Sequence, residues 1–573
     1  MTWIAAGSAA IIVLLVAMLL SPLRVNHDCA MYLQEAELLL DGGVPYVDFV
    51  ETNPPLIVYL SALPVMLART TGISAIVCFH GLVVLLLIVS AAELYCLMTR
   101  PWRPFLPHER GVLLFVWLAL ALAVLRRHEF GQREHLFVLL YVPYLFLRIG
   151  RYQGGSAPWP LAVLLGLQAG VGAAIKPHFL MTALLVEIVL LCTTRLPRGS
   201  GSADGNTAVR KSGSLQWADT SLRCIVFRPE NVALVLIVLA YLAHWLFVPA
   251  AMREAFFYRW LPMIREGYAA YDSSYRQIAE EIFRRPLLVF LLAATVLAAA
   301  GAIGGRSRLR DYLLALAAFT ASSLAMVFVQ KKGWSYHAIP LEAGAAVATS
   351  LAAIQILRRL HRSRRWRFMR VRLIRAGFAA GWLLLASVLA LILSGRFPPE
   401  GEPPVFASLR RIVETHSRPG EAVMLVASSV RPAYPMLLQL DRKPGSRYLC
   451  CFPIAFFNHG GDLEAAQRRF LDELAEDIGH RTPRLVIIAD FPGGQGLPRS
   501  FNCFDYLSES GWIGGSLHAY GEISGPDGWR VFVRDSNYGR PASNLSVSCR
   551  RRLQSPTAMP KTTSIGNWSR LLQ

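Results

Sequence analysis

Several motifs that mark common enzyme classes are missing from this sequence of 573 residues. It contains no GxSxG motif and no zinc-binding motif, which argues against a membrane hydrolase. It has nine cysteines, but five of them lie in or near apolar segments, so they do not form a disulfide scaffold. No internal repeat is visible either. The strongest remaining signal is the distribution of hydrophobic residues.

Hydrophobic residues make up 54% of the chain, and its mean hydropathy is +0.40. Apolar runs of roughly 16 to 24 residues recur along it, and most are long enough to cross a bilayer core of ~30 Å. The sequence therefore predicts an α-helical polytopic membrane protein with about eleven transmembrane helices. The predicted spans are 3–20, 75–98, 111–126, 135–147, 159–175, 178–194, 231–250, 286–304, 312–329, 338–357 and 376–394.

Two apolar segments need a separate interpretation. The segment 54–69 is short and begins with Pro-Pro, so we expect a helix that lies at the membrane surface or re-enters it. The first span has no basic residues before it and no convincing cleavage site, so we do not expect a cleaved signal peptide.

Lys and Arg residues concentrate in one set of alternate loops, and nine arginines lie between Arg358 and Arg375. The positive-inside rule places this set in the cytoplasm, together with the N-terminus. The same bias explains much of the net charge of +20, so no nucleic-acid partner is expected. We therefore expect a multi-pass membrane protein.

The chain changes character after the last span. Residues 1–398 form the predicted transmembrane domain, with a first external loop at 21–74. Residues 399–545 have the pattern of an extracytoplasmic α/β domain, and the tail 546–573 is expected to be disordered. Buried strands are predicted within 422–428 and 484–490, a helix over 463–479 and an edge strand at 529–536. Oxidation in that domain would allow a disulfide from Cys450 or Cys451 to Cys503.

Polar clusters that are too costly for ordinary linkers fall on the predicted external side. The first is "HDCAMYLQEAELLLDGGVPYVDFVETNPPLIVYLSALP" at 27–64, and others lie at 126–135, 175–179 and 330–337. Ionisable residues at the ends of membrane helices are functional candidates. The long loop 251–285 fits an amphipathic surface helix or a substrate lid.

The first external loop resembles that of the GT-C superfamily of membrane glycosyltransferases. The pattern comprises Asp28, Tyr32, "AELLLDGGVPY" and "NPPL" at 53–56. It is most similar to protein O-mannosyltransferases and lipid A aminoarabinose transferases, although Cys29 and Asn53 stand where many of those proteins have Glu and Lys. The resemblance implies a GT-C-like fold and a polyprenyl-phosphate sugar as donor. The sugar and the acceptor, which is an extracytoplasmic glycan, lipid or protein, stay open.

Such a transfer needs a general base, groups that stabilise the departing phosphate, and an apolar groove for the isoprenoid tail. Asp28 is the predicted base, and its alternative role is a helix N-cap. Asp48 is the second predicted catalytic carboxylate, and its alternative role is to turn the chain. Glu51, Asn53 and Arg133 are candidates for acceptor binding or for structural contacts. A divalent metal is allowed by these carboxylates, but none is expected.

The candidates for binding the donor phosphate and sugar lie in two short segments, "IKPHF" and "QKKGWSYH". They are Lys176, His178, Lys331, Lys332, Trp334 and His337. Ammonium groups, a glycine and aromatic rings together suit an anion with an attached sugar. Lys176 has the alternative of snorkelling to the membrane surface. The segment 126–135 has the alternative of forming only ion pairs that hold two helices together, through Arg127, Glu129, Glu134 and His135.

Two other classes of protein remain open at this point. One is a multi-pass transporter or flippase of lipid-linked envelope precursors, although the spans show no pair of similar halves. The other is a scaffold without enzymatic activity, in which Asp28 would be replaceable without effect.

Overall fold

The computed structural model describes residues 11–13, 16, 25–100, 105–126, 128–195, 227–303, 309–362, 402–459 and 463–535. These residues are mostly helical, and the chain divides into two compact units. The first comprises 1–24, 67–247 and 273–397, and the second comprises 25–66, 248–272 and 398–573. The predicted boundary at 398/399 lies outside the described residues, and the second unit also includes two earlier segments.

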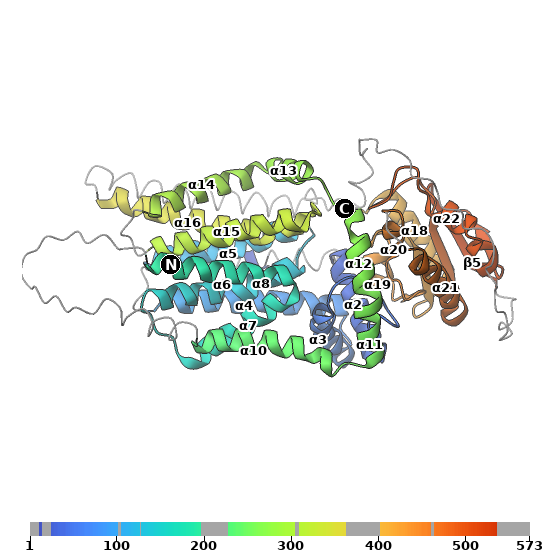
Figure 1. Ribbon diagram of the computed structural model, residues 1–573, viewed down its shortest axis with the longest axis horizontal. Helices are drawn as coiled ribbons and strands as arrows, with labels where there is room; N and C mark the ends of the chain where they lie inside the picture. The colour runs from blue at the N-terminus through green and yellow to red at the C-terminus, as the bar shows by residue number, and fades with distance from the viewer. Residues whose placement is uncertain are drawn as a thin grey trace, which may run out of the picture. The chain divides into compact units, whose positions relative to one another are not determined.

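The first unit is a bundle of long helices that lie side by side (Figure 1). Its elements are α4 (Ala75–Met98), α5 (Pro107–Arg126), α6 (Arg133–Tyr152), α7 (Trp159–Ile175), α8 (Pro177–Arg195), α10 (Pro229–Ala243), η1 (His244–Leu246), α13 (Tyr275–Phe283), α14 (Pro286–Ile303), α15 (Arg310–Gln330), η4 (Ser335–Ala338) and α16 (Ile339–Arg362). Small residues bring α7 and α10 close together, because a Cβ atom at Gly166 would lie 2.2 Å from the backbone oxygen of Glu230.

Five helices in the described part of the chain are long and apolar enough to cross a membrane. They are Ala75–Met98, Pro229–Leu246, Pro286–Ile303, Arg310–Gln330 and Ser335–Arg359. Leu56–Thr71, Trp159–Ile175 and Pro177–Cys192 are shorter apolar helices. The helical membrane character is therefore supported.

The predicted number of eleven spans is not confirmed. Two of the predicted spans, 3–20 and 376–394, lie outside the described residues, as do the linker 197–214 and the tail 546–573. The spans predicted at 111–126, 135–147, 159–175 and 178–194 fall on α5, α6, α7 and α8, which are not among the five helices. For α6 the reason is its charge, because the helix runs from Arg133 through Arg148 and Arg151.

A buried network of ion pairs joins α6, α8 and α10. Arg148 is fully buried and donates to Glu187 at 2.7 Å and to Glu230 at 3.2 Å, while Arg151 donates to Glu230 at 2.9 Å. The predicted span 135–147 ends before Arg148 and Arg151, but α6 continues to Tyr152 and buries both. A buried charge is tolerated when it is paired, and here two guanidinium groups face two carboxylates.

Removing one carboxylate from this network is expected to destabilise the bundle. Glu230→Gln would leave Arg148 and Arg151 buried with one fewer negative charge, at a cost of about 3 kcal/mol. The change should lower the melting temperature of the purified protein. Glu280→Gln is the matched control, because Glu280 pairs with Arg276 on the exposed helix α13 and such pairs contribute about 1 kcal/mol or less. Equal melting temperatures for the two variants would contradict a stabilising role of the network.

The second unit combines a mixed sheet with helices from three separate parts of the chain. From the first loop come α2 (His27–Leu40) and the beginning of α3 (Leu56–Thr71). The middle segment supplies α11 (Ala250–Glu254), the π-helix η2 (Ala255–Trp260), α12 (Leu261–Gly267) and η3 (Tyr268–Tyr271). The C-terminal segment supplies α18 (Pro404–His416), β1 (Ala422–Val426), α19 (Ala433–Gln439), β2 (Lys443–Pro444), α20 (Pro453–Phe457), α21 (Glu464–Arg481), β3 (Leu485–Ala489), α22 (Cys503–Glu509), α23 (Trp512–Ser516), β4 (Tyr520–Ile523) and β5 (Trp529–Arg534).

The sheet of the second unit has the strand order β2-β1-β3-β5-β4. Strands β2, β1 and β3 are parallel, whereas β5 is antiparallel to both β3 and β4. The two buried strands and the helix predicted from the sequence are confirmed as β1, β3 and α21. The prediction of an edge strand at 529–536 is wrong, because β5 lies inside the sheet and β4 forms the edge. The loop predicted as helix or lid at 251–285 is helical, and it is divided between the two units.

Cys450, Cys451 and Cys503 are buried in the second unit, and each is a free thiol. The disulfide considered from the sequence is therefore absent from these three residues. Burial raises the pKa of the Cys503 thiol to about 12. At pH 8 the thiolate fraction of Cys503 is then roughly one in ten thousand.

We therefore expect the folded protein to resist alkylation by iodoacetamide at Cys503 at pH 8, as measured by peptide mass spectrometry. Unfolding the protein in denaturant at the same pH should make Cys503 react, since its pKa returns toward the ordinary value. Fast modification in the folded protein would show that the thiol is accessible and contradict its burial.

Candidate functional site

Three of the predicted polar clusters meet at one end of the helical bundle. Lys176 follows the end of α7, and Glu134 lies in the first turn of α6. The Lys176 Nζ atom donates to Glu134 Oε1 at 2.5 Å, and both side chains are buried. The ammonium group also lies 5.4 Å from the ring centre of Tyr336. Lys176 is therefore held inside the protein by an anion and a ring, which argues against a lysine that snorkels to the membrane surface.

The segment "KKGWSYH" brings further groups to this cluster. His337 Nε2 lies 3.8 Å from Glu134 Oε1, and the charges of Lys176, Arg133, His178 and Lys332 all act on His337. The chain turns at Gly333, which has a φ of +65°, a backbone conformation that glycine adopts without steric cost. The Ser335 hydroxyl donates to the buried carboxylate of Glu129, which anchors the turn.

Arg133, Lys176, His178 and Lys332 thus all lie close enough to His337 to act on its charge. We call Arg133, Lys176 and Lys332 with Glu129, Glu134, His178 and His337 the cationic cluster. The ring of Trp334 lies 5.5 Å from that of His337 and adds an aromatic surface. Lys331 is not part of the cluster, because its Nζ atom lies over the ring of Tyr275 at 5.2 Å.

The ion-pair alternative for the 126–135 segment is supported for Glu134, which pairs with Lys176. Arg133 and Lys332 bring further positive charge to the cationic cluster. Such cations offer charge-assisted hydrogen bonds to phosphate oxygens, so the cluster is a candidate anion site.

An apolar pocket adjoins the cationic cluster. It lies between α4, α5, α6 and α16, and its lining includes Leu87, Trp117, His135, Ile339 and Glu342. His135 follows Glu134 in α6, and Ile339 lies two residues after His337, so the same stretches of chain supply the pocket and the cationic cluster. The sequence contained no signal for this pocket, because its lining comes from four helices far apart in the chain.

Replacement of Lys176 should weaken anion binding. We expect Lys176→Met to reduce the affinity of the purified protein for dodecyl phosphate by at least about tenfold, since one charge-assisted contact is lost. Binding can be measured by native mass spectrometry in detergent. Arg276→Met is the control, because it removes an equal charge from an exposed position on α13. If both variants lose the same affinity for dodecyl phosphate, the loss reflects net charge alone, and a specific anion site is contradicted.

The carboxylates of the first loop belong to the second unit. Asp28 lies in the first turn of α2 and is 8% exposed. The N-cap is Asn26, whose side chain accepts from the backbone N–H groups of Asp28 and Cys29 at 2.8 and 3.4 Å. The alternative role of Asp28 as the N-cap is therefore wrong, and its carboxylate is not used for capping. His27 Nε2 lies 3.4 Å from the Asp28 carboxylate.

Glu51 is the other buried carboxylate of this loop, with 2% exposure. Its Oε1 atom accepts from the backbone N–H of Asn53 at 2.9 Å, from the Asn53 side chain and from Thr52. Its Oε2 atom has no hydrogen-bond partner among the described residues. One oxygen is thus fixed, while the other is buried and available to accept a proton or a hydroxyl group.

Asp28 and Glu51 act on a common neighbour. Burial raises the pKa of the Cys450 thiol above its usual range, and the negative charges of Asp28 and Glu51 raise it further. Two carboxylates that both act on one thiol lie in the same region of the second unit.

Asp48 makes the contact expected of a turn residue. Its Oδ2 atom accepts from the backbone N–H of Val44 at 2.7 Å, and its side chain is exposed. Tyr46 within this turn has a φ of +67°, and its hydroxyl donates to the Asn53 backbone oxygen at 2.6 Å. The turn thereby positions Asn53 and, through it, Glu51.

No group of three or more His, Cys, Asp or Glu side chains in the described ranges is arranged to hold a metal ion. No protein-family model matches this chain, and no curated protein matches it.

Proposed function

We propose that this chain is an integral membrane glycosyltransferase that moves a sugar from a polyprenyl-phosphate donor to an extracytoplasmic acceptor. The observation that carries the proposal is the cationic cluster beside an apolar pocket in the first unit. A polyprenyl phosphate has one anionic group at the end of a long hydrocarbon chain. The cluster suits the phosphate, and the pocket has a mostly apolar lining.

The buried carboxylates of the second unit support the acceptor half of the reaction. In the proposed step, Asp28 takes the proton from the acceptor hydroxyl, and the resulting oxygen forms a bond to the anomeric carbon. The bond between that carbon and the phosphate oxygen breaks, and the electron pair leaves on polyprenyl phosphate. A single displacement of this kind inverts the anomeric configuration.

Glu51 is a stronger candidate than Asp48 for the second catalytic carboxylate. It is buried with one available oxygen, whereas Asp48 is exposed and fixed to the Val44 N–H group. Asn53 would then act by orienting Glu51. Lys176, Lys332 and His337 would stabilise the charge that develops on the departing phosphate.

The proposed setting is a bacterial inner membrane, with the N-terminus in the cytoplasm and the C-terminal domain outside. The competing proposal is a transporter or flippase of lipid-linked envelope precursors. The observation on its side is the buried network around Arg148 and Glu230, since transporters place ionisable groups inside the membrane. Each arginine of that network is matched by a carboxylate, which suits a structural role better.

The proposal predicts a specific lipid phenotype. Cells that lack the gene, and cells that carry Asp28→Asn or Glu51→Gln at equal expression, should accumulate a polyprenyl-phosphate sugar and lose one glycan modification. The loss of a carboxylate base from general acid–base catalysis lowers the rate by roughly 10²- to 10⁴-fold. The measurement is mass spectrometry of lipid extracts.

Asp41→Asn is the matched control, since Asp41 is an exposed carboxylate at the end of the same helix, α2. It should restore the lipid profile of the parent strain. If the deletion has a phenotype but Asp28→Asn and Glu51→Gln both behave as wild type, the transferase proposal is wrong and transport or scaffolding explains the phenotype better.

A further inference from the structure

The sheet of the second unit has a topological switch point. From β1 the chain moves to β2 on one side and then returns to β3 on the other side of β1. In open α/β sheets, small ligands bind in the crevice at the carboxyl ends of such strands. Here that crevice lies between the loop 427–432, which follows β1, and the loop 490–496, which follows β3.

This crevice is filled by the chain itself. The Tyr271 hydroxyl, at the end of η3, lies 2.9 Å from the Ser428 backbone oxygen and 3.4 Å from that of Phe452. The loop after β3 also fits Tyr271, because a Cβ atom at Gly496 would lie 2.9 Å from the nearest ring carbon. Ser428 and Gly494 close the remaining space, since a Cβ atom at Gly494 would lie 3.1 Å from the Ser428 hydroxyl oxygen.

The rest of the middle segment 248–272 is packed equally closely against the C-terminal part. A Cβ atom at Gly267 would lie 2.2 Å from the Cβ atom of Phe456. The rings of Tyr268 and Tyr271 both contact Phe456, with ring centres 6.0 and 6.1 Å apart. Arg259 pairs with Glu473 of α21. Glycine is therefore required at 267 and 496 by the neighbouring side chains.

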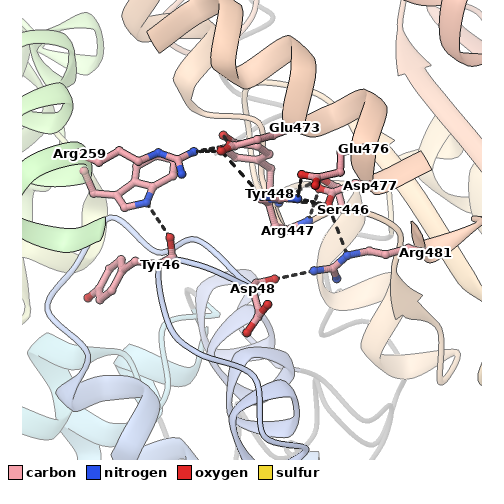
Figure 2. A network of polar contacts seen from close by, with 11 residues as sticks. Tyr46, Asp48, Arg259, Ser446, Arg447, Tyr448, Glu473, Glu476, Asp477 and Arg481 are labelled. Atoms are coloured by element: carbon pink, nitrogen blue, oxygen red, sulfur yellow. Dashed lines mark hydrogen bonds and ion pairs between the residues drawn. The ribbon is translucent and has the colours of Figure 1, made fainter. Parts of the chain in front are cut away.

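The first loop is attached to the same assembly, as Figure 2 shows. The Trp260 indole donates to the Tyr46 backbone oxygen at 2.9 Å, and Arg481 of α21 donates to the Asp48 backbone oxygen at 2.6 Å. The backbone N–H of Val50 donates to the Arg447 backbone oxygen at 2.9 Å. The contacts to residues 46–50 fix the chain immediately before Glu51.

Arg447 is itself immobilised by carboxylates of α21. Its side chain donates to Asp477 at 3.0 Å and to Glu476 at 2.6 Å, and its backbone N–H donates to Asp477 at 2.7 Å. The Ser446 hydroxyl donates to the same Asp477 carboxylate at 2.8 Å. The loop before Glu51 is thus docked on a rigid part of the C-terminal domain.

We propose that the C-terminal α/β domain is an intramolecular clamp. The crevice that such a sheet commonly offers to a small ligand holds Tyr271 of the chain instead, and the clamped segment 248–272 fixes the loop that carries Glu51. Tyr271 and Trp260 are accordingly positioning residues. The clamp stands on the contacts alone, while its effect on catalysis rests on the proposed function.

The clamp can be tested by hydrogen exchange of the full-length protein in detergent. Gly496→Ala would push against the Tyr271 ring, so we expect about tenfold faster exchange at 268–272 and, through Trp260, at 44–51. Exchange in α6 should stay unchanged. Gly420→Ala is the matched control, because Gly420 also has a positive φ, +82°, but a Cβ atom there meets nothing within 4 Å. Gly420→Ala should match the wild type at both segments.

If Gly496→Ala and Gly420→Ala leave the same exchange pattern at 268–272, the clamp is wrong. If 268–272 loosens while 44–51 stays protected, the claim that the clamp fixes the first loop is wrong. If Gly496→Ala also unprotects β1 and β3, Tyr271→Phe decides, because it keeps the ring and removes only the hydroxyl. Faster exchange at 268–272 in Tyr271→Phe with protected strands supports the clamp, and unchanged exchange there overturns it.

These outcomes do not depend on enzymatic activity. A protein that shows the expected exchange pattern but transfers no sugar would retain the clamp and lose the proposed function. If the clamp positions the acceptor, as proposed, Tyr271→Phe should stay active. Its KM for the acceptor should rise, while its KM for the donor should stay unaltered. Identical kinetics in wild type and Tyr271→Phe, despite loosened exchange at 44–51, would contradict that link.

Discussion

A charge buried in an apolar helix bundle must be paired, because an isolated ion there costs several kcal/mol. This constraint shapes both ends of the first unit. At one end Arg148 and Arg151 are matched by Glu187 and Glu230, and the result is a balanced network that joins three helices. At the other end Arg133, Lys176 and Lys332 gather around His337, and these cations make the cationic cluster a candidate anion site.

The same constraint explains which features the sequence could predict. Lys176 and His337 stand out because polar residues are rare in apolar segments, and the order of the predicted spans puts both on the external side. The partner of Lys176 did not follow, since any of several carboxylates at that end had suitable spacing and only the packing of α6 against α7 selects Glu134. The network around Arg148 was missed because an arginine at the end of an apolar run looks the same whether the helix stops or continues.

In the second unit, local patterns predicted β1, β3 and α21, because strand and helix periodicity are visible over a few residues. Strand order is a long-range property, so β5 was placed wrongly at the edge of the sheet. The attachment of residues 25–66 and 248–272 to the C-terminal segment was also beyond local patterns. Gly267 and Gly496 are the residues in the sequence that reflect this attachment. A side chain at either position would clash with Phe456 or Tyr271, and those neighbours are known only from the structure. The first-loop pattern singles out Asp28 as a candidate, whereas the burial of Glu51 depends on the turn at Tyr46.

The central claim is that the protein transfers a sugar from a polyprenyl phosphate. The most direct measurement uses the purified full-length protein in proteoliposomes that contain a radiolabelled polyprenyl-phosphate sugar, together with an extract of envelope acceptors. We expect time-dependent release of polyprenyl phosphate and label in an acceptor, both lost in Asp28→Asn and weakened in Lys176→Met. If the labelled lipid instead crosses the bilayer with its sugar still attached, and Asp28→Asn has no effect, the protein is a lipid transporter and the account is wrong.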